Sequence, residues 1–236
     1  KKDPTYDAER FLVLDDIRLD DKGKIAPESS MDGMMGGRFG NVLLTNGLDE
    51  GIMTVALALL PRTGADAVVV EPAYGMFGPS ARLAGARVVP VVPSPDLRFS
   101  LDTVCAALTP ATRLLFVASP NNPTGEIVPA EAIAQLAAAM PDGGAVFVDE
   151  AYADFEGRTV VGDVACTPNL VVGRTFAKAY GLAGMRIGCL VAQPPIIRLL
   201  RGAIAPFSVN VFAAAALDAA LGDRGYFTWY VGQVRT

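Results

Sequence analysis

Short apolar runs alternate with helical stretches from about residue 42 to residue 221. The apolar runs, several of them rich in β-branched residues, are predicted strands at 68–70, 87–92, 114–118, 145–148, 170–172 and 186–191. Helices, most of them rich in alanine, are predicted between and after them at 49–60, 77–84, 130–140, 195–203 and 209–221. This alternation predicts an α/β domain with a mainly parallel central sheet, flanked by helices on both faces.

The two ends of the chain follow a different pattern. Residues 1–41 show no strong periodicity and are predicted to form an N-terminal arm or irregular segment. Residues 42–221 are predicted as one large domain, and residues 222–236 as the start of a connection to a smaller domain. The apolar stretch 204–221 is interrupted by Pro206, Asn210 and Asp218, which favours a buried helix over a membrane span. No membrane partner is therefore expected.

Composition removes several classes of chemistry. The 236 residues include no histidine, which excludes Ser-His-Asp and Cys-His catalysis and leaves acid–base work to Lys, Tyr, Asp or Glu. The three cysteines are far apart and form no CxxC pair, so we expect no metal site and reduced thiols in the cytoplasm. The net charge of −5 argues against nucleic acid as a partner.

Polar residues follow three of the predicted strands, at the point where each strand ends. Asp149 and Tyr152 come after the strand at 145–148, Asn122 after 114–118, and Lys178 after 170–172. Ligands of open α/β sheets bind beyond the carboxyl ends of the strands. We therefore expect these side chains to converge on one site.

Each polar segment has two interpretations when it is taken alone. Lys178 and Arg186 suit a carbonyl carbon and a phosphate, but a surface lysine and arginine on a glycine-rich loop fit equally well. Asp149 at a strand end needs a partner, which a protonated pyridine nitrogen, a local arginine or a helix end would supply. The helix start at Asn46–Asp49 offers backbone N–H groups to an anion, while the Asp49 side chain is better read as an N-cap.

Four segments occur together in the order of a known family: TNGLDEGI, SPNNPTG, VDEAY and RTFAKAYGLAGMRIG. The chain resembles the class I/II aminotransferases of fold type I, which depend on pyridoxal 5′-phosphate (PLP), and it is most similar to the histidinol-phosphate aminotransferase branch. The resemblance implies the type I PLP-dependent transferase fold. We expect the family's small C-terminal domain, which carries the arginine for the substrate carboxylate, to be truncated here.

The resemblance also implies roles for individual residues. Lys178 forms the Schiff base with PLP, Asp149 pairs with the pyridinium nitrogen, and Asn122 and Tyr152 hydrogen-bond the phenolic oxygen. Tyr74 stacks on the ring. The phosphate is held by Arg186, Thr175 and the backbone at Gly47, Leu48 and Asp49. Lys178, Asp149 and Tyr152 are the expected catalytic residues. The family usually has serine where this chain has Ala177, so one hydroxyl contact to phosphate is lost.

The function implied is ping-pong transfer of an amino group between an amino acid, or an amino-acid-like phosphate ester, and a 2-keto acid. The resemblance also implies a homodimer acting on small molecules. A PLP-dependent decarboxylase or cyclase on the same scaffold stays open, as does a PLP-binding module without turnover. A nucleotide-binding dehydrogenase is disfavoured because no GxGxxG follows the first strand.

Overall fold

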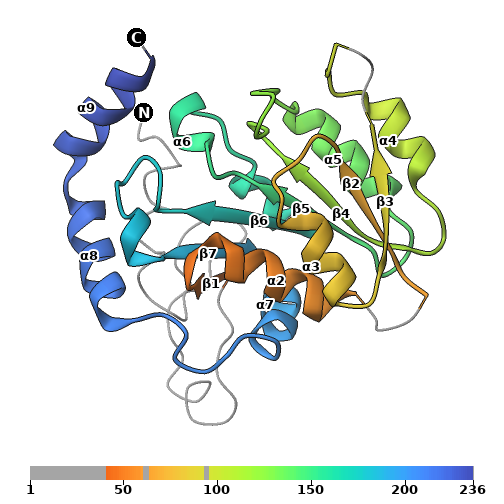
Figure 1. Ribbon diagram of the computed structural model, residues 1–236, viewed down its shortest axis with the longest axis horizontal. Coiled ribbons are helices and arrows are strands. Elements are labelled where there is room, and N and C mark those ends of the chain that lie inside the picture. Colours follow the sequence, from red (N-terminus) through yellow and green to blue (C-terminus); the bar gives the residue numbers. More distant parts are fainter. Residues whose placement is uncertain (1–40, 61–63, 93–95, 236) are drawn as a thin grey trace.

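A computed structural model describes residues 41–60, 64–92 and 96–235. The predicted N-terminal arm therefore lies almost wholly outside the described residues. The described strands form one sheet in the order β1-β7-β6-β5-β4-β2-β3 (Figure 1). Their bounds are β1 Val42–Thr45, β2 Asp66–Val70, β3 Arg87–Val91, β4 Thr112–Ala118, β5 Ala145–Asp149, β6 Leu170–Thr175 and β7 Gly188–Ala192. The predicted α/β class is confirmed.

Most neighbouring strands of the sheet run parallel. Parallel pairing joins β3 to β2, β2 to β4, β4 to β5 and β5 to β6. The exception is β7, which pairs antiparallel with both β6 and β1. The parallel strands bring their carboxyl ends to one edge of the sheet, which is the edge that the sequence predicted for the site.

Helices connect the strands and cover both faces of the sheet. Their bounds are α2 Gly47–Leu59, α3 Phe77–Leu83, α4 Leu101–Ala107, α5 Ala130–Ala139, α6 Ala153–Glu156, α7 Pro194–Arg201, α8 Val211–Gly222 and α9 Arg224–Arg235. Two short 3₁₀ turns, η1 at Val161–Ala165 and η2 at Ala183–Met185, complete the described elements.

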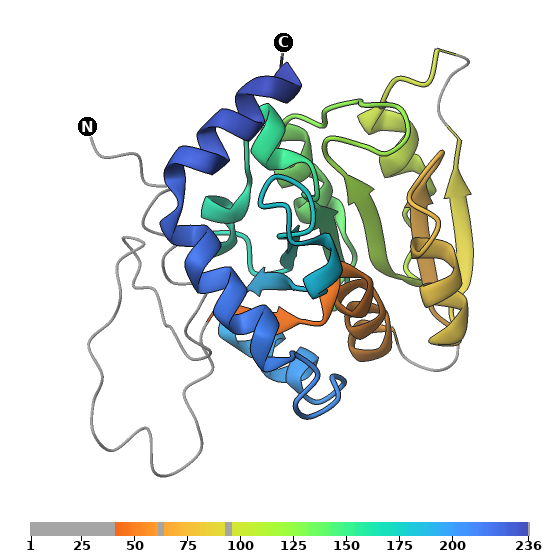
Figure 2. The same cartoon turned by 60° about the vertical axis from the view of Figure 1, so that its left-hand side comes forward.

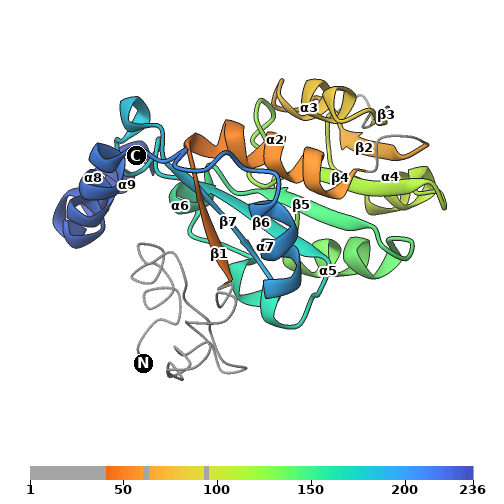
Figure 3. The same ribbon diagram turned by 90° about the horizontal axis from the view of Figure 1, so that it is seen from below.

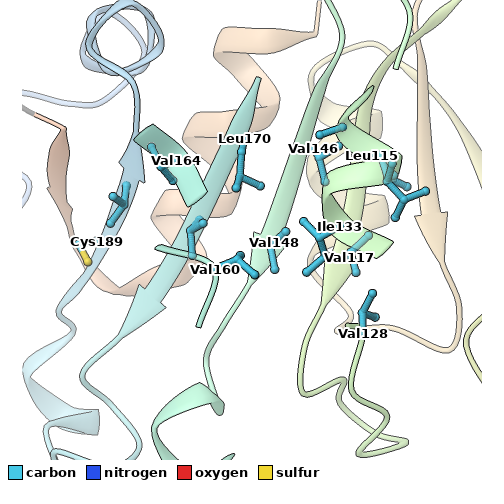
Figure 4. Close-up of a cluster of buried hydrophobic side chains, with 14 of the residues drawn as sticks. Leu115, Val117, Val128, Ile133, Val146, Val148, Val160, Val164, Leu170 and Cys189 are labelled. Carbon is cyan, nitrogen blue, oxygen red and sulfur yellow. The ribbon is translucent and has the colours of Figure 1, made fainter. Parts of the chain in front are cut away.

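The sheet separates two hydrophobic cores. On one face, α2, α3 and α7 bury Ile52, Phe77 and Ile197, each with 0–1% of its surface exposed. On the other face lie α4, α5 and α8. Figure 3 shows α2 and α3 on one side of the sheet and α5 on the other. In Figure 4, Ile133 of α5 lies beside side chains of β4 and β5, namely Leu115, Val117, Val146 and Val148.

The structure adds elements that the apolar pattern did not reveal. β1, α4, α6 and α9 were not predicted, because β1 and α6 are only four residues long and α4 and α9 lack a long apolar run. The strand expected from Arg186 begins instead at Gly188, because Arg186 has a left-handed backbone with φ 55°. That conformation ends an extended strand and turns the Arg186 side chain out of the sheet.

The last two helices run one after the other along the side of the domain (Figure 2). Aromatic contacts attach α9 to the body, with the rings of Phe227 and Tyr180 4.8 Å apart and those of Tyr230 and Phe155 6.1 Å apart. Among the described residues, no helix has the length and apolar character needed to span a membrane.

Candidate active site

A cavity opens at the carboxyl ends of β4, β5 and β6, beside the start of α2. It encloses about 620 Å³ of empty space when its open mouth is included. Nine of the ten residues predicted to bind the cofactor line it: Leu48, Asp49, Tyr74, Asn122, Asp149, Tyr152, Thr175, Lys178 and Arg186. The tenth, Gly47, lies against Arg186 at the cavity's rim. The structure thus brings together residues spread over 140 positions of the sequence.

Asp149 is the last residue of β5, and only 5% of its surface is exposed. Its carboxylate accepts a hydrogen bond of 2.8 Å from the N–H of Ala151 and forms no ion pair with any described residue. Burial raises the pKa of Asp149 to about 7; the charges of Asp49 and Glu150 add to this, and the Ala151 N–H and Lys178 oppose it. A cationic partner in the cavity would stabilise its ionised form.

Lys178 lies in the loop between β6 and η2, facing Tyr152. Its Nζ lies 5.3 Å from the centre of the Tyr152 ring, within the range of a cation–π contact. The loop is closed by hydrogen bonds from Gly181 N to Lys178 O and from Leu182 N to Phe176 O. Gly181 has φ 69°, a conformation that favours glycine, and this turn directs the lysine toward the cavity.

The start of α2 forms the other end of the cavity. Gly47 has φ 75°, and a Cβ atom there would lie 2.4 Å from Nη2 of Arg186. Gly188 is constrained in a similar way, since its Cβ would lie 2.9 Å from the backbone N of Leu48. Both glycines let backbone and guanidinium approach the helix start closely. The first-turn N–H groups and Arg186 together offer several hydrogen-bond donors to an anion.

The interpretation of Asp49 as the N-cap of this helix is wrong. The N-cap residue is Asn46, whose side chain makes no capping hydrogen bond. Asp49 uses both carboxylate oxygens elsewhere: Oδ1 accepts from the Tyr74 hydroxyl at 2.8 Å, and Oδ2 accepts from Nη2 of Arg186 at 2.9 Å. The hydrogen bond and charge of Asp49, together with partial burial, raise the pKa of Tyr74 to about 12.

Thr175 and Asn122 complete the predicted set. The Thr175 hydroxyl is buried at the end of β6 and accepts from the N–H of Ala177 at 3.2 Å. Asn122 lines the cavity from the loop after β4. Its neighbour Asn121 fixes that loop, because its Nδ2 donates to the Pro72 carbonyl and to the Thr124 hydroxyl, both at 2.9 Å. Sequence reasoning had not assigned Asn121 a role.

A buried cluster of charged residues behind the site was also missed. Arg174 pairs with Glu150 at 3.3 Å and with Asp154, and these side chains are 14%, 3% and 6% exposed. Glu150 also accepts from the Thr159 hydroxyl and from the Val160 N–H, each at 2.6 Å. The alternation of side chains along a strand could have revealed this cluster, because neighbouring residues face opposite sides. Glu150 follows the cavity residue Asp149, and Arg174 precedes the cavity residue Thr175, so both face away from the cavity.

Comparison with known proteins agrees with the geometry. The model of the family "Aminotransferase class I and II" matches residues 36–234. The histidinol-phosphate aminotransferase 2 of Ralstonia nicotianae is 41% identical over 189 residues, which are 78% of this chain and 50% of that protein. The histidinol-phosphate aminotransferase 1 of Cupriavidus pinatubonensis is 42% identical over 187 residues, 78% of this chain and 49% of that protein.

Solved structures show the same likeness. The histidinol-phosphate aminotransferase of Sinorhizobium meliloti, in complex with pyridoxal-5′-phosphate, superposes with a TM-score of 0.76 and 29% identity. The match covers 82% of this chain and 53% of that one. The chain thus spans about half the length of the curated relatives it matches. Because the family model covers nearly the whole chain, this protein belongs to the class I and II aminotransferases.

Proposed function

We propose that this chain binds PLP in the cavity and carries the cofactor half of an aminotransferase site. The observation that carries the proposal is the buried Asp149 carboxylate, which shares one cavity with Lys178, with Arg186 and with the start of α2. These three groups suit the three reactive parts of PLP: a ring nitrogen, an aldehyde carbon and a phosphate. The donor set therefore fits the cofactor.

Asp149 has the most direct physical argument. Its raised pKa means that the groups of the protein around it stabilise its anion poorly. A protonated ring nitrogen would supply the missing counter-charge, and the ionised carboxylate would in turn keep that nitrogen protonated. Bound there, PLP would supply a carbon for covalent attachment of the lysine and a ring that accepts electrons from the substrate α-carbon.

The other predicted residues would bind or orient the cofactor. Arg186, Thr175 and the backbone at Gly47, Leu48 and Asp49 would hold the phosphate, at the positive end of α2. Tyr74 would stack on the ring, and Asn122 and Tyr152 would hydrogen-bond its phenolic oxygen. The Lys178 amine, once free, would move a proton to and from the substrate α-carbon.

The proposed reaction is ping-pong transfer of an amino group between an amino acid, or an amino-acid-like phosphate ester, and a 2-keto acid. Relatives named histidinol-phosphate aminotransferase, about 40% identical, support this substrate class. Family membership supports the transfer itself over decarboxylation or cyclisation.

Three further features belong to the proposal. We infer a large PLP-binding domain at 42–221, with 222–236 leading to a smaller domain. We infer a homodimer, supported by large apolar side chains exposed around α8, among them Phe207 and Phe212. We infer a cytoplasmic enzyme, supported by free thiols at all three cysteines, Cys105, Cys166 and Cys189.

Covalent trapping tests the proposal sharply, because Lys178 is the only lysine after Lys24. The chain is incubated with PLP, reduced with borohydride and digested, and the pyridoxyl group is mapped by mass spectrometry. We expect it on Lys178 in the wild type and in a Lys24→Arg control, and not at that position in Lys178→Arg. Labelling confined to Lys1, Lys2, Lys22 and Lys24 would refute PLP binding in the cavity.

Turnover is tested separately on the loaded protein. A panel of amino acids and, separately, histidinol phosphate are added as amino donors, and the cofactor is extracted and identified. Accumulation of pyridoxamine phosphate together with a keto product supports amino transfer. Release of carbon dioxide, or an unchanged cofactor with every amino acid, contradicts it.

A further inference from the structure

The Asp49 carboxylate lies beside Arg186, at the end of the cavity where the proposed function places the phosphate of the cofactor. Two anionic groups would therefore compete for the same guanidinium. We propose that Asp49 is an internal counter-ion of Arg186, which an incoming phosphate must displace and which thereby sets the anion selectivity of the site. This inference rests on the proposed function, because it concerns the phosphate end of the same cavity. It assigns a role to the Asp49 side chain, beyond the backbone contact expected there.

The contacts show that the carboxylate takes up the arginine's charge. Oδ2 of Asp49 accepts from Nη2 of Arg186 at 2.9 Å, while Nη1 of Arg186 donates to the Ala183 carbonyl at 3.2 Å. Nη2 also lies against Gly47, at the helix start where phosphate would bind. The guanidinium is thus held in place before any ligand arrives, and part of its charge is already neutralised.

The other oxygen keeps Asp49 in this place. Oδ1 accepts from the Tyr74 hydroxyl at 2.8 Å, so Tyr74 fixes the orientation of the carboxylate. Both partners of the ion pair are partly open to solvent, with 45% of the Arg186 side chain and 43% of the Asp49 side chain exposed. A pair of this kind is weak, so an anion of higher charge can replace it.

The charge of an anion then determines whether it can displace Asp49 from Arg186. A monoanion such as acetate offers Arg186 the same charge as Asp49, and it must be captured from solution, whereas Asp49 is already tethered. A phosphate dianion offers twice the charge and can use the backbone N–H groups of the helix start as well. Asp49 therefore lowers affinity for every anion at this end, and a dianion with several contacts tolerates the cost best.

Glu50 provides a matched control on the same helical turn. Its Oε2 accepts from the backbone N–H of Asn46 at 2.6 Å, and its carboxylate forms no ion pair with Arg186 or any other described residue. Glu50→Gln and Asp49→Asn remove the same charge from the same end of α2. Only Asp49→Asn removes the counter-ion of Arg186, so a comparison of the two separates the ion pair from the general field of the helix end.

Binding of inorganic phosphate and of acetate to the full 236-residue chain is measured by titration calorimetry in phosphate-free buffer. The chains compared are wild type, D49N, E50Q, R186Q and the double variant D49N/R186Q, each checked for folding by circular dichroism. We expect D49N to bind phosphate about three- to fivefold more tightly than wild type, the size of one exposed ion pair. We expect acetate to gain at least as much, and E50Q to change by less than twofold.

The double variant decides whether the gain acts through Arg186. If it does, D49N gives no gain in the R186Q chain. Three results would overturn the inference. Folded D49N could bind phosphate no more tightly than wild type, D49N could give the same gain in the R186Q chain as in the wild type, or neither wild type nor D49N could bind phosphate. The proposed function fails on a different result, namely no covalent PLP at Lys178 of the wild type.

Discussion

At the scale of single residues, Asp149 shows how burial sets chemistry. Its carboxylic acid is nearly enclosed, and its pKa of about 7 lies well above the ordinary value of 3.8. Between these two pH values the folded chain holds a proton that the unfolded chain has released. The contribution of Asp149 to stability therefore falls as pH rises from about 4 to about 7.

The variant Asp149→Asn removes this titration while keeping the shape of the side chain. We expect its free energy of unfolding, relative to wild type, to rise by roughly 3–4 kcal/mol between pH 4 and pH 8 in the absence of PLP. Urea unfolding at a series of pH values measures this difference. A difference independent of pH would show that the carboxyl titrates normally. With PLP present, we expect the wild type to be the more stable of the two above pH 7, because only its carboxylate offers a counter-charge to the ring.

The interpretation of the Asp49 side chain shows where prediction from a local motif fails. The sequence placed Asp49 at a helix start, and its side chain was interpreted as an N-cap. Asn46 took the capping position, and Asp49 reached Arg186, which lies 137 positions later in the chain. A local pattern reports the helix end, but it contains no information on which distant side chain will face it.

At the scale of elements, buried charges link β5, β6 and α6 behind the cavity. Glu150 follows β5, Arg174 lies in β6 and Asp154 lies in α6. Their ion pairs are far less exposed than the Arg98–Asp96 pair, whose side chains are 75% and 60% exposed. The network ties together the strand ends that present Asp149 and Thr175, so it supports the site without contacting the cavity.

The variant Arg174→Met keeps much of the side-chain volume and leaves Glu150 and Asp154 without that cation. We expect a loss of about 3–5 kcal/mol in the free energy of unfolding at pH 8, because two buried carboxylates then lack their shared counter-charge. Burial already raises the pKa of Glu150, and Arg174 opposes that rise, so the loss should shrink in acid as Glu150 becomes protonated. Arg98→Met is the control and should cost less than about 1 kcal/mol.

Denaturant unfolding at pH 5 and pH 8 measures both variants. A cost of Arg174→Met no larger than that of Arg98→Met would mean that the cluster contributes nothing to stability. A cost that did not change with pH would contradict the role of the carboxylate charges.

At the scale of the whole molecule, the surface around α8 and α9 is unusually apolar. The expectation that the stretch 204–221 forms a buried helix is wrong, because only Ala213 and Leu217 of α8 are buried. The exposed fractions of Phe207, Phe212 and Trp229 are 101%, 75% and 58%. Large exposed apolar patches mark interaction sites. The homodimer that we propose would bury part of this surface.

Two serine substitutions test this assembly. We expect the wild-type chain to sediment as a dimer and Phe212→Ser to weaken its association at least tenfold, since burying a phenylalanine contributes about 1.5–3 kcal/mol. Leu83→Ser is the control, because Leu83 is 70% exposed on α3, at the far side of the sheet. Analytical ultracentrifugation over a range of concentrations measures both. A monomeric wild type, or equal effects of the two substitutions, would contradict a dimer through α8.

The sequence by itself determined the α/β class and most strand positions, because apolar periodicity reports burial directly. It also placed Asp149, Tyr152, Asn122 and Lys178 at one edge, because the carboxyl ends of parallel strands lie together. The other predicted residues of the cavity came from the resemblance to a known family. Only the tertiary structure decided the partners of those residues: Asp49 with Arg186 and Tyr74, and Arg174 with Glu150 and Asp154. It also decided the short strand β1 and the antiparallel β7. These features depend on contacts between segments far apart in the chain, whose distances and facing sides a one-dimensional pattern does not contain.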